Sequence, residues 1–181
     1  MNFIAGVDEV GRGCLAGPVI AAAVVLKTNI PGLADSKKLS KKKREELSST
    51  IMQNSYFSFG SASVEEIDSI NILQASLLAM KRAILNLSVE PGKILVDGMH
   101  KPDFDIDTQT IIGGDSVVDE ISAASIIAKV YRDNLMMQFD KKYPDFYFSS
   151  HKGYGTKLHK AAIKKHGITP IHRKTFKGVI A

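Results

Sequence analysis

Apolar side chains form two kinds of pattern along this chain. The first kind, continuous or alternating apolar positions, predicts strands. Residues 3–9 and 18–27 are almost continuous apolar runs, the second rich in Val, Ile and Ala, which is typical of buried strands. The glycine-rich stretch between them favours a hairpin turn. Residues 56–63 alternate aromatic with small side chains, as a half-buried strand does, and 93–97 and 110–112 predict two further short strands.

The second kind of pattern, in which apolar residues recur every three or four positions, predicts helices. One helix begins near Ser40, two follow over 71–87 and 117–142, and a basic helix over 156–167 is the last. The order of elements is therefore two strands, a helix, a strand, a helix, two strands and two helices. We expect an α/β fold, a mixed β-sheet flanked by helices with a C-terminal helical segment.

The composition is that of an ordinary globular protein, with 44% hydrophobic and 24% charged residues among 181. No shift in composition marks a boundary, so we expect a single domain over 1–181. No apolar stretch is long enough to span a bilayer, and the N-terminus lacks the basic region of a signal peptide. Cys14 is the only cysteine, which excludes an internal disulfide and a cysteine-cluster zinc site. We expect a cytoplasmic monomer with no membrane association.

The net charge of +5 is unevenly distributed. The segment of about 146–181 has no acidic residue and carries eight Lys or Arg, whereas 1–145 carries a net charge of −3. A near-neutral body with a basic end favours an anionic partner, with nucleic acid the leading candidate, although a merely solubilising basic surface is the alternative. Four histidines of the segment are interpreted as phosphate-facing or surface residues and not as metal ligands: His151, His159, His166 and His172.

Three of the nineteen acidic residues lie where an apolar strand ends, namely Asp8, Asp97 and Asp115. Strand ends are places where a rigid sheet can aim side chains at one point. Carboxylates that converge repel one another unless a cation lies between them, and oxygen-only clusters suit Mg²⁺ or Mn²⁺. We therefore predict a site for one of these ions, although a solvated strand end would be the simpler explanation for Asp97 alone.

Glu9 directly follows Asp8, and adjacent residues on a regular strand point to opposite faces. Both can reach one ion only if the strand ends or bends there, which Gly11 and Gly13 would permit. For the adjacent pair, the alternatives that compensate the charge are a metal ion, an internal cation and exposure at the strand end.

Residues near these acids suit recognition of a sugar. Backbone groups in the turn Gly11-Arg12-Gly13 could sense one hydroxyl, because a missing Cβ allows close contact, although a plain hairpin turn is the alternative. Tyr154 lies between two glycines, which favours an exposed ring that packs on a sugar or base.

Three lysines suit the phosphates of a duplex. Lys37 and Lys38 follow the second predicted strand, and Lys152 precedes the tyrosine. Each alone is more typical of a solvated surface charge. Together with the basic segment they predict binding that weakens steeply with salt.

The chain resembles the ribonuclease HII family over nearly its whole length, about residues 4–176. The resemblance rests on motifs in the family's order: GVDEVGRGCLAGPV, DSKKLS, EIDSINILQAS, ILVDG, GGDS, ISAASIIAKVYRD, YPDFYFSSHKGYGTKLH and HRKTF. No single motif is decisive, but their ordered combination is specific.

This resemblance implies a ribonuclease H-like fold and a centre for Mn²⁺ or Mg²⁺ made by Asp8, Glu9, Asp97 and Asp115. It implies an endoribonuclease that hydrolyses the RNA strand of RNA–DNA hybrids by two-metal-ion catalysis. It also implies that duplex DNA is nicked 5′ to an embedded ribonucleotide, leaving 3′-hydroxyl and 5′-phosphate ends. The Gly-Arg-Gly turn would contact the 2′-hydroxyl mainly through its backbone, and the motif tyrosine would pack on the sugar beside the cleaved junction.

Two departures and two alternatives accompany the resemblance. Cys14 stands where the family often has proline. Asp119 and Glu120 stand near a stretch that is less acidic in many members, so an accessory metal role for Glu120 stays open. One alternative is a non-catalytic nucleic-acid-binding module whose acids only stabilise loops. The other is a related metal nuclease with a different substrate, such as a ribonuclease HIII-type hybrid nuclease or a DNA resolvase.

Overall fold

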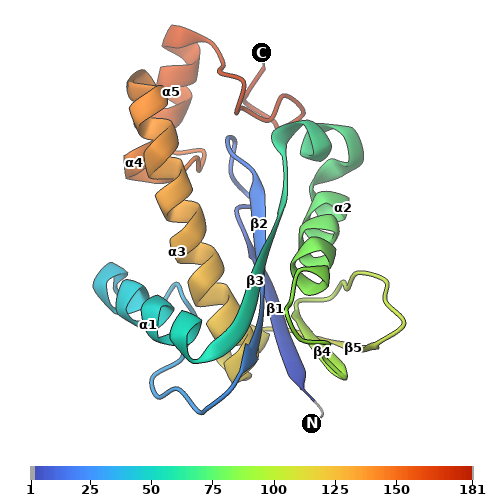
Figure 1. Ribbon diagram of the computed structural model, residues 1–181. Helices are drawn as coiled ribbons and strands as arrows, with labels where there is room; N and C mark the ends of the chain where they lie inside the picture. Colours follow the sequence, from blue (N-terminus) through green and yellow to red (C-terminus); the bar gives the residue numbers. More distant parts are fainter. Residues whose placement is uncertain (1–2, 181) are drawn as a thin grey trace.

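A mixed five-stranded sheet forms the centre of the computed structural model, which describes residues 3–180 (Figure 1). Its strands are β1 (Ile4–Val10), β2 (Val19–Leu26), β3 (Ser55–Ala62), β4 (Lys93–Asp97) and β5 (Asp107–Ile111). They lie in the order β3-β2-β1-β4-β5. The pairs β1–β2 and β2–β3 are antiparallel, whereas β1–β4 and β4–β5 are parallel. The predicted mixed sheet is confirmed, and β5 begins before the predicted 110 because backbone pairing with β4 needs no apolar side chain.

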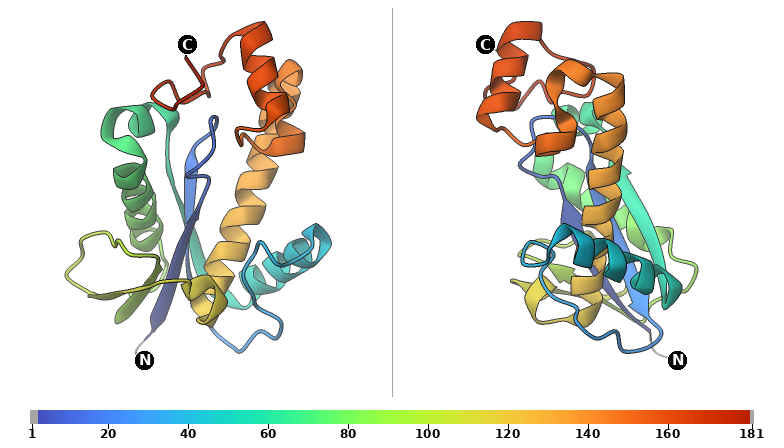
Figure 2. Two further views of the ribbon diagram at one scale, coloured as in Figure 1. Left: turned by 180° about the vertical axis from the view of Figure 1, so that it is seen from behind. Right: turned by 90° about the vertical axis from the view of Figure 1, so that its left-hand side faces the viewer.

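Helices cover both faces of the sheet. They are α1 (Lys41–Gln53), α2 (Val64–Leu85), α3 (Asp119–Lys142), α4 (Phe148–His151) and α5 (Lys157–His166), with short 3₁₀ turns η1 (Gly114–Ser116) and η2 (Pro144–Phe146). Helix α2 packs on one face, and α1 and α3 pack on the other (Figure 2). All four predicted helices are present, but α2 begins at Val64 and not at the predicted 71, because the apolar period describes only the part after Asn71, where a φ of +69° interrupts the helical backbone. The sequence did not predict α4, since four residues are too few to show a helical period.

Strand β2 explains why its sequence is an unbroken apolar run. Ala21 and Ala23 belong to the core cluster under α2, whereas Ala22 and Val24 belong to the cluster under α1 and α3. A strand that is covered on both faces needs apolar residues at every position.

Gly6 lets helix α3 begin directly against β1. A Cβ atom at this position would lie 2.1 Å from the backbone carbon of Glu120, in the first turn of α3. Side chains alternate along a strand, so Asp8 points to the same face of β1 as Gly6. The close approach therefore places the first half of α3 beside this acid.

The C-terminal segment packs on the second half of α3 and crosses above the β1–β2 hairpin toward α2 (Figure 1). A third core cluster joins it to the body through five fully or nearly buried residues: Ala16, Met136, Phe146, Phe148 and Ala162. The predicted C-terminal helical segment is confirmed. That residues 1–181 form a single domain stays a prediction.

Three of the four C-terminal histidines are buried, so the prediction that they face phosphate or solvent is wrong for them. The His151 ring stacks on His159 with centroids 4.4 Å apart, and Nε2 of His159 lies 3.0 Å from Nε2 of His172. On the amphipathic helix α5, His159 shares its inward face with Ala162. Only His166 is exposed.

Within residues 3–180, no helix combines the length and the apolar character that crossing a bilayer would demand.

We predict that these buried histidines make the protein less stable as the pH falls from about 6.5 toward 4. Burial lowers the pKa of His159 and of His172 to about 4, below the 6.5 of an unfolded histidine. The unfolded state therefore binds protons first, and stabilisation that is complete above pH 6.5 is lost toward pH 4. Urea unfolding midpoints at several pH values measure this.

The control compares how steeply the free energy of unfolding changes with pH in wild type and variants, because other groups also titrate between pH 6.5 and 4. Between pH 6.5 and 4.5, the wild type should lose roughly 2–3 kcal/mol more than a His172→Gln variant. The exposed-site variant His166→Gln should follow the wild type. Equal pH dependence in wild type and His172→Gln would contradict the prediction.

Candidate active site

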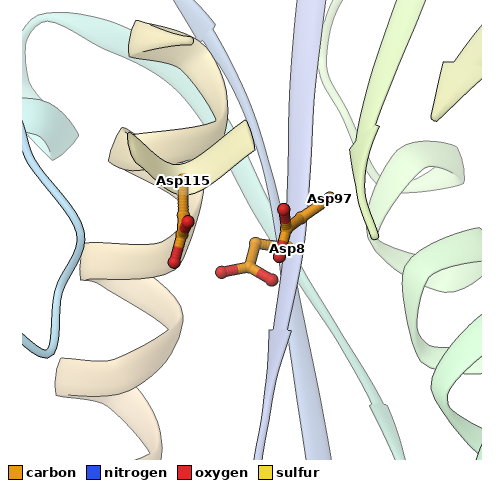
Figure 3. A group of neighbouring side chains, drawn as sticks. All are labelled: Asp8, Asp97 and Asp115. Carbon is orange, nitrogen blue, oxygen red and sulfur yellow. The ribbon is translucent and has the colours of Figure 1, made fainter. Parts of the chain in front are cut away.

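Three carboxylates converge at one edge of the sheet, from Asp8, Asp97 and Asp115 (Figure 3). Each offers an oxygen, and these oxygens all lie within 4.8 Å of one another. Asp8 lies in β1, Asp97 ends β4, and Asp115 lies in η1, after β5. Because β1, β4 and β5 are parallel, their carboxyl ends meet at the same edge, which brings together residues that are far apart in the sequence.

Local hydrogen bonds fix two of the acids in place. Asp97 Oδ1 accepts a hydrogen bond from the Gly114 amide at 2.8 Å, which ties the end of β4 to η1. The backbone carbonyl of Asp115 accepts from Ser122 Oγ at 2.5 Å, which ties η1 to the start of α3. The acids are thus held by rigid elements instead of by a free loop.

The electrostatics of the cluster favour a bound cation. Asp8 and Asp115 are only 7% and 6% exposed, so exposure at a strand end does not account for them. Burial raises the pKa of Asp8 well above its usual range, and repulsion by Glu9 and Asp97 adds to the rise. Burial, followed by repulsion from Asp115, also raises the pKa of Asp97. Buried, mutually repelling oxygen ligands fit a hard divalent ion such as Mg²⁺ or Mn²⁺.

The cation nearest the three acids is an exposed lysine, and it pairs with only one of them. Lys37 Nζ lies 3.6 Å from Asp115 Oδ2, and the lysine side chain is 80% exposed. Because water solvates this ammonium, the pair offsets little of the repulsion among the three acids. The metal explanation therefore accounts for the cluster better than the lysine does.

Glu9 is close to this cluster but is not part of the convergent group. Its carboxylate pairs with Arg12, with Oε1 3.2 Å from Nη1, and burial raises the pKa of Glu9. Strand β1 neither ends nor bends at Glu9, because its register with β2 continues to Val10 opposite Ile20. Since the ladder with β4 stops at Val7, the strand edge beside Glu9 is open, and its side chain borders the same cleft.

A cleft of about 480 Å³ joins the acids to the predicted substrate contacts. The predicted residues on its wall are Asp8, Glu9, Gly11, Arg12, Gly13, Lys37, Asp97 and Tyr154. Tyr154 is 38% exposed, as predicted.

Three polar residues on the wall were not predicted, namely Ser36, Ser125 and Lys129, and the apolar Val10 also lines it. The hydroxyls of the two serines share a hydrogen bond of 3.0 Å, which joins the loop that carries Ser36 and Lys37 to α3. Lys129 lies one helical turn after Ser125, with its ammonium 5.8 Å from the centroid of the Tyr154 ring. The signal in the sequence that could have identified Ser125 and Lys129 is that these two polar residues lie four positions apart on an otherwise apolar face of the helix.

Two of the predicted phosphate contacts lie outside the cleft wall. Lys38 is exposed next to Lys37. Lys152 lines a separate groove of about 240 Å³ together with Lys41 and Arg44, and its ammonium donates to the Ser149 carbonyl. Glu120 is not in the convergent acid group, and it borders another pocket, beside Asn29.

The glycines of the turn have different roles. Gly11 has a φ of +97°, and a Cβ there would lie 2.3 Å from Arg132 Nε, so the fold itself requires this glycine. At the exposed Gly13, a Cβ would meet no atom within 4 Å. Packing within the protein therefore does not explain why this position is a glycine, whereas the close approach of a ligand would.

Two fully buried arginines hold the turn from beneath. Arg173 donates to the carbonyls of Gly11 at 2.7 Å, Arg12 at 2.8 Å and Gly17 at 2.8 and 3.0 Å. Arg132 donates in the same way to three further carbonyls, those of Ala16, Pro18 and Lys152. Counting Arg173 in a basic surface was therefore wrong, because this side chain supports the turn.

A sheet of this order with acids at its parallel edge belongs to the ribonuclease H-like nucleases, as comparison with solved structures shows. The fold is similar to ribonuclease H2 from Pyrococcus horikoshii OT3, with a TM-score of 0.80 and 28% identity over 98% of this chain and 95% of that one. It is also similar to Bst-RNase HIII in complex with Mn²⁺, with a TM-score of 0.70 and 18% identity over 98% of this chain and 68% of that one, which shows the fold alone.

The family follows from sequence. The family model described as Ribonuclease HII matches residues 5–179. A relative named Ribonuclease HII from Coxiella burnetii (strain Dugway 5J108-111) is 59% identical over 180 residues, which are 98% of this chain and 89% of the relative. The chain belongs to the ribonuclease HII family and is an enzyme, a ribonuclease of the H type. The alternative of a non-catalytic binding module is thereby overturned.

We predict that a divalent metal stabilises this protein and that Asp97→Asn removes most of the effect. At a metal concentration 100 times its Kd, stabilisation of about 2.7 kcal/mol would raise the Tm by roughly 5–10 °C. Without metal, Asp97→Asn should melt a few degrees higher than the wild type, because one repelling carboxylate is gone while Gly114 keeps an acceptor. Thermal melts with EDTA, Mg²⁺ or Mn²⁺ measure both effects.

The matched control is Asp103→Asn, in an exposed loop, which should behave as the wild type. A wild-type Tm that is the same in EDTA and in both metals would contradict a metal site.

Proposed function

We propose that this ribonuclease cleaves the RNA strand of RNA–DNA hybrids and nicks duplex DNA on the 5′ side of an embedded ribonucleotide. The observation that carries the proposal is a single cleft lined both by acids of the cluster, Asp8 and Asp97, and by the glycine turn and Tyr154. Substrate chemistry and discrimination between RNA and DNA would then take place within one binding region.

Asp8, Asp97 and Asp115 would hold the metal, with Glu9 completing the set. Their oxygen-only character and mutual repulsion fit Mg²⁺ or Mn²⁺. When bound, a pair of such ions supplies charge stabilisation at the attacking and departing oxygens of a phosphodiester. Attack of water on the phosphorus with breakage of the bond to the 3′-oxygen would leave 3′-hydroxyl and 5′-phosphate ends.

Arg12 and Glu9 would change partners when substrate binds. In this structure the Arg12 guanidinium is half-exposed and pairs with the Glu9 carboxylate. A phosphate in the cleft would offer Arg12 a better, bidentate partner. Glu9 would then be free to turn toward the other acids.

The glycine turn would recognise the 2′-hydroxyl. Arg173 already engages the carbonyls of Gly11 and Arg12. The amides of Arg12 and Gly13 donate to no backbone carbonyl within residues 3–180. These amides would donate to the 2′-hydroxyl oxygen, a group that DNA lacks.

The rest of the duplex would follow the lysines. Lys37 and Lys129 flank the cleft, and Lys38 and Lys152 extend the positive charge to either side. Tyr154 would pack on the sugar next to the cleaved junction. The expectations of a monomer and of a cytoplasmic location stay predictions.

We predict metal-dependent cutting of a duplex that carries one ribonucleotide. The nick should fall on its 5′ side with Mg²⁺ or Mn²⁺, and an all-DNA duplex of the same sequence should stay intact. Asp97→Asn should lower the rate by about 10³-fold or more, because electrostatic stabilisation is usually the largest catalytic contribution. Gel analysis of end-labelled strands reads the rate and the position, with Asp103→Asn as control. Equal cutting of both duplexes, or cutting in EDTA, would refute the proposal.

We predict that Gly13→Ala separates recognition from folding. Because the added Cβ meets no protein atom, the Tm should stay within about 1–2 °C of wild type. The kcat/KM on the single-ribonucleotide duplex should fall at least tenfold, equivalent to about 1.4 kcal/mol. Gly11→Ala is the contrasting variant and should lower the Tm itself, since its Cβ would collide with Arg132. Wild-type kcat/KM in Gly13→Ala would show that the substrate does not approach this face.

A further inference from the structure

Two buried histidines form a hydrogen-bond relay that ends on the backbone of Tyr154. The Thr169 amide donates to His172 Nδ1 at 2.9 Å, so the proton of this neutral ring is on Nε2. That Nε2–H donates to His159 Nε2 at 3.0 Å, and His159 Nδ1–H donates to the Tyr154 carbonyl at 2.9 Å. Every ring nitrogen therefore has a partner, and the direction of each bond follows from the first.

The two relay rings are buried, and a buried polar group costs free energy unless it is hydrogen-bonded. Both rings are fully buried and pack beside Phe148, at centroid distances of 5.4 and 5.8 Å. Burial lowers the pKa of both histidines to about 4, which agrees with neutral rings. Apolar side chains of the same size would fill this space without needing partners. A fully satisfied polar network instead holds its end groups in one arrangement.

The loop that carries Tyr154 is held partly by hydrogen bonds of its own: the Tyr154 amide donates to the His151 carbonyl at 2.9 Å, and the Thr156 amide donates to the Tyr154 carbonyl at 2.8 Å. Glycines flank the tyrosine, and Lys152 before them has a φ of +51°. Two further contacts tie this loop to the rest of the fold: the relay donates to the Tyr154 carbonyl through His159 Nδ1, and the Leu15 amide donates to the Gly153 carbonyl at 2.8 Å.

The same C-terminal stretch also holds the glycine turn. His172 begins the relay to Tyr154, and the next residue, Arg173, donates to the carbonyls of Gly11 and Arg12. One dipeptide therefore connects the two elements that the proposed function assigns to the two sugars at the cleavage junction.

We propose that His159 and His172 are positioning residues that fix Tyr154 relative to the Gly-Arg-Gly turn and thereby set the affinity for the ribonucleotide junction. This inference rests on the proposed function, in which Tyr154 contacts a sugar. Neither histidine touches substrate, and both act through the tyrosine backbone.

Two variants at position 159 separate the two hydrogen bonds of the relay, the bond to the Tyr154 carbonyl and the bond to His172. In His159→Asn the side-chain amide lies near the place of Nδ1 and keeps a donor for the Tyr154 carbonyl. In His159→Gln it lies near Nε2 and keeps the contact with His172 but loses that donor. On the single-ribonucleotide duplex, His159→Gln should raise KM about tenfold with kcat within twofold, whereas His159→Asn should keep KM within about threefold of wild type. His166→Gln, on the exposed side of the same helix, is the control.

A double-mutant cycle separates positioning from general stability. In a Tyr154→Ala background, His159→Gln should raise KM no further, because the relay would have no ring left to position. His172→Asn keeps the acceptor for Thr169 but loses the donor to His159, and it should repeat the KM rise if His159→Gln folds poorly. Melting curves confirm that each variant is folded at the assay temperature.

The outcomes distinguish the inference from the proposed function. If the wild type does not cut the single-ribonucleotide duplex selectively, the proposed function fails. If it does, equal KM values for His159→Gln and His159→Asn overturn the relay's role. A KM rise that persists in full in the Tyr154→Ala background also overturns it, because the histidines would then act on the fold as a whole.

Discussion

The repulsion among three carboxylates at one edge of the sheet, two of them buried and the third half-buried, is the constraint on which the other features depend. Bringing Asp8, Asp97 and Asp115 together raises the free energy of the metal-free fold, and burial increases this cost. The apolar clusters on both faces of the sheet offset it. Parallel pairing of the strands makes the convergence unavoidable. A divalent cation would turn the same repulsion into binding energy.

Backbone contacts from distant side chains build the substrate side of the cleft. Arg173 and Arg132 are buried cations whose hydrogen bonds all go to carbonyls, and they shape the glycine turn at a distance of more than 100 residues in the sequence. The histidine relay does the same for the loop of Tyr154. Fixed donors and acceptors of this kind lower the conformational entropy that substrate binding must remove.

Family membership and geometry answer different questions about this protein. The Ribonuclease HII match assigns the class of enzyme but says nothing of how Glu9 and Arg12 are paired. The geometry shows three acids together and a fourth, Glu9, paired with an arginine. Basic charge is also distributed differently than along the chain, since Arg173 and three C-terminal histidines are inside the protein.

The sequence by itself determined the strands and the longer helices, the strand-end positions of the acids and the family, because these depend on local apolar period and on ordered motifs. It also singled out Tyr154 as an exposed ring, since glycines on both sides leave it little to pack against. Only the tertiary structure decided that His159 and His172 are internal, that Arg173 supports the turn and that Lys129 lines the cleft. The reason is physical: whether a polar side chain is buried depends on the partners that folding brings to it. Those partners lie up to 162 residues away in the chain, beyond the reach of any local pattern.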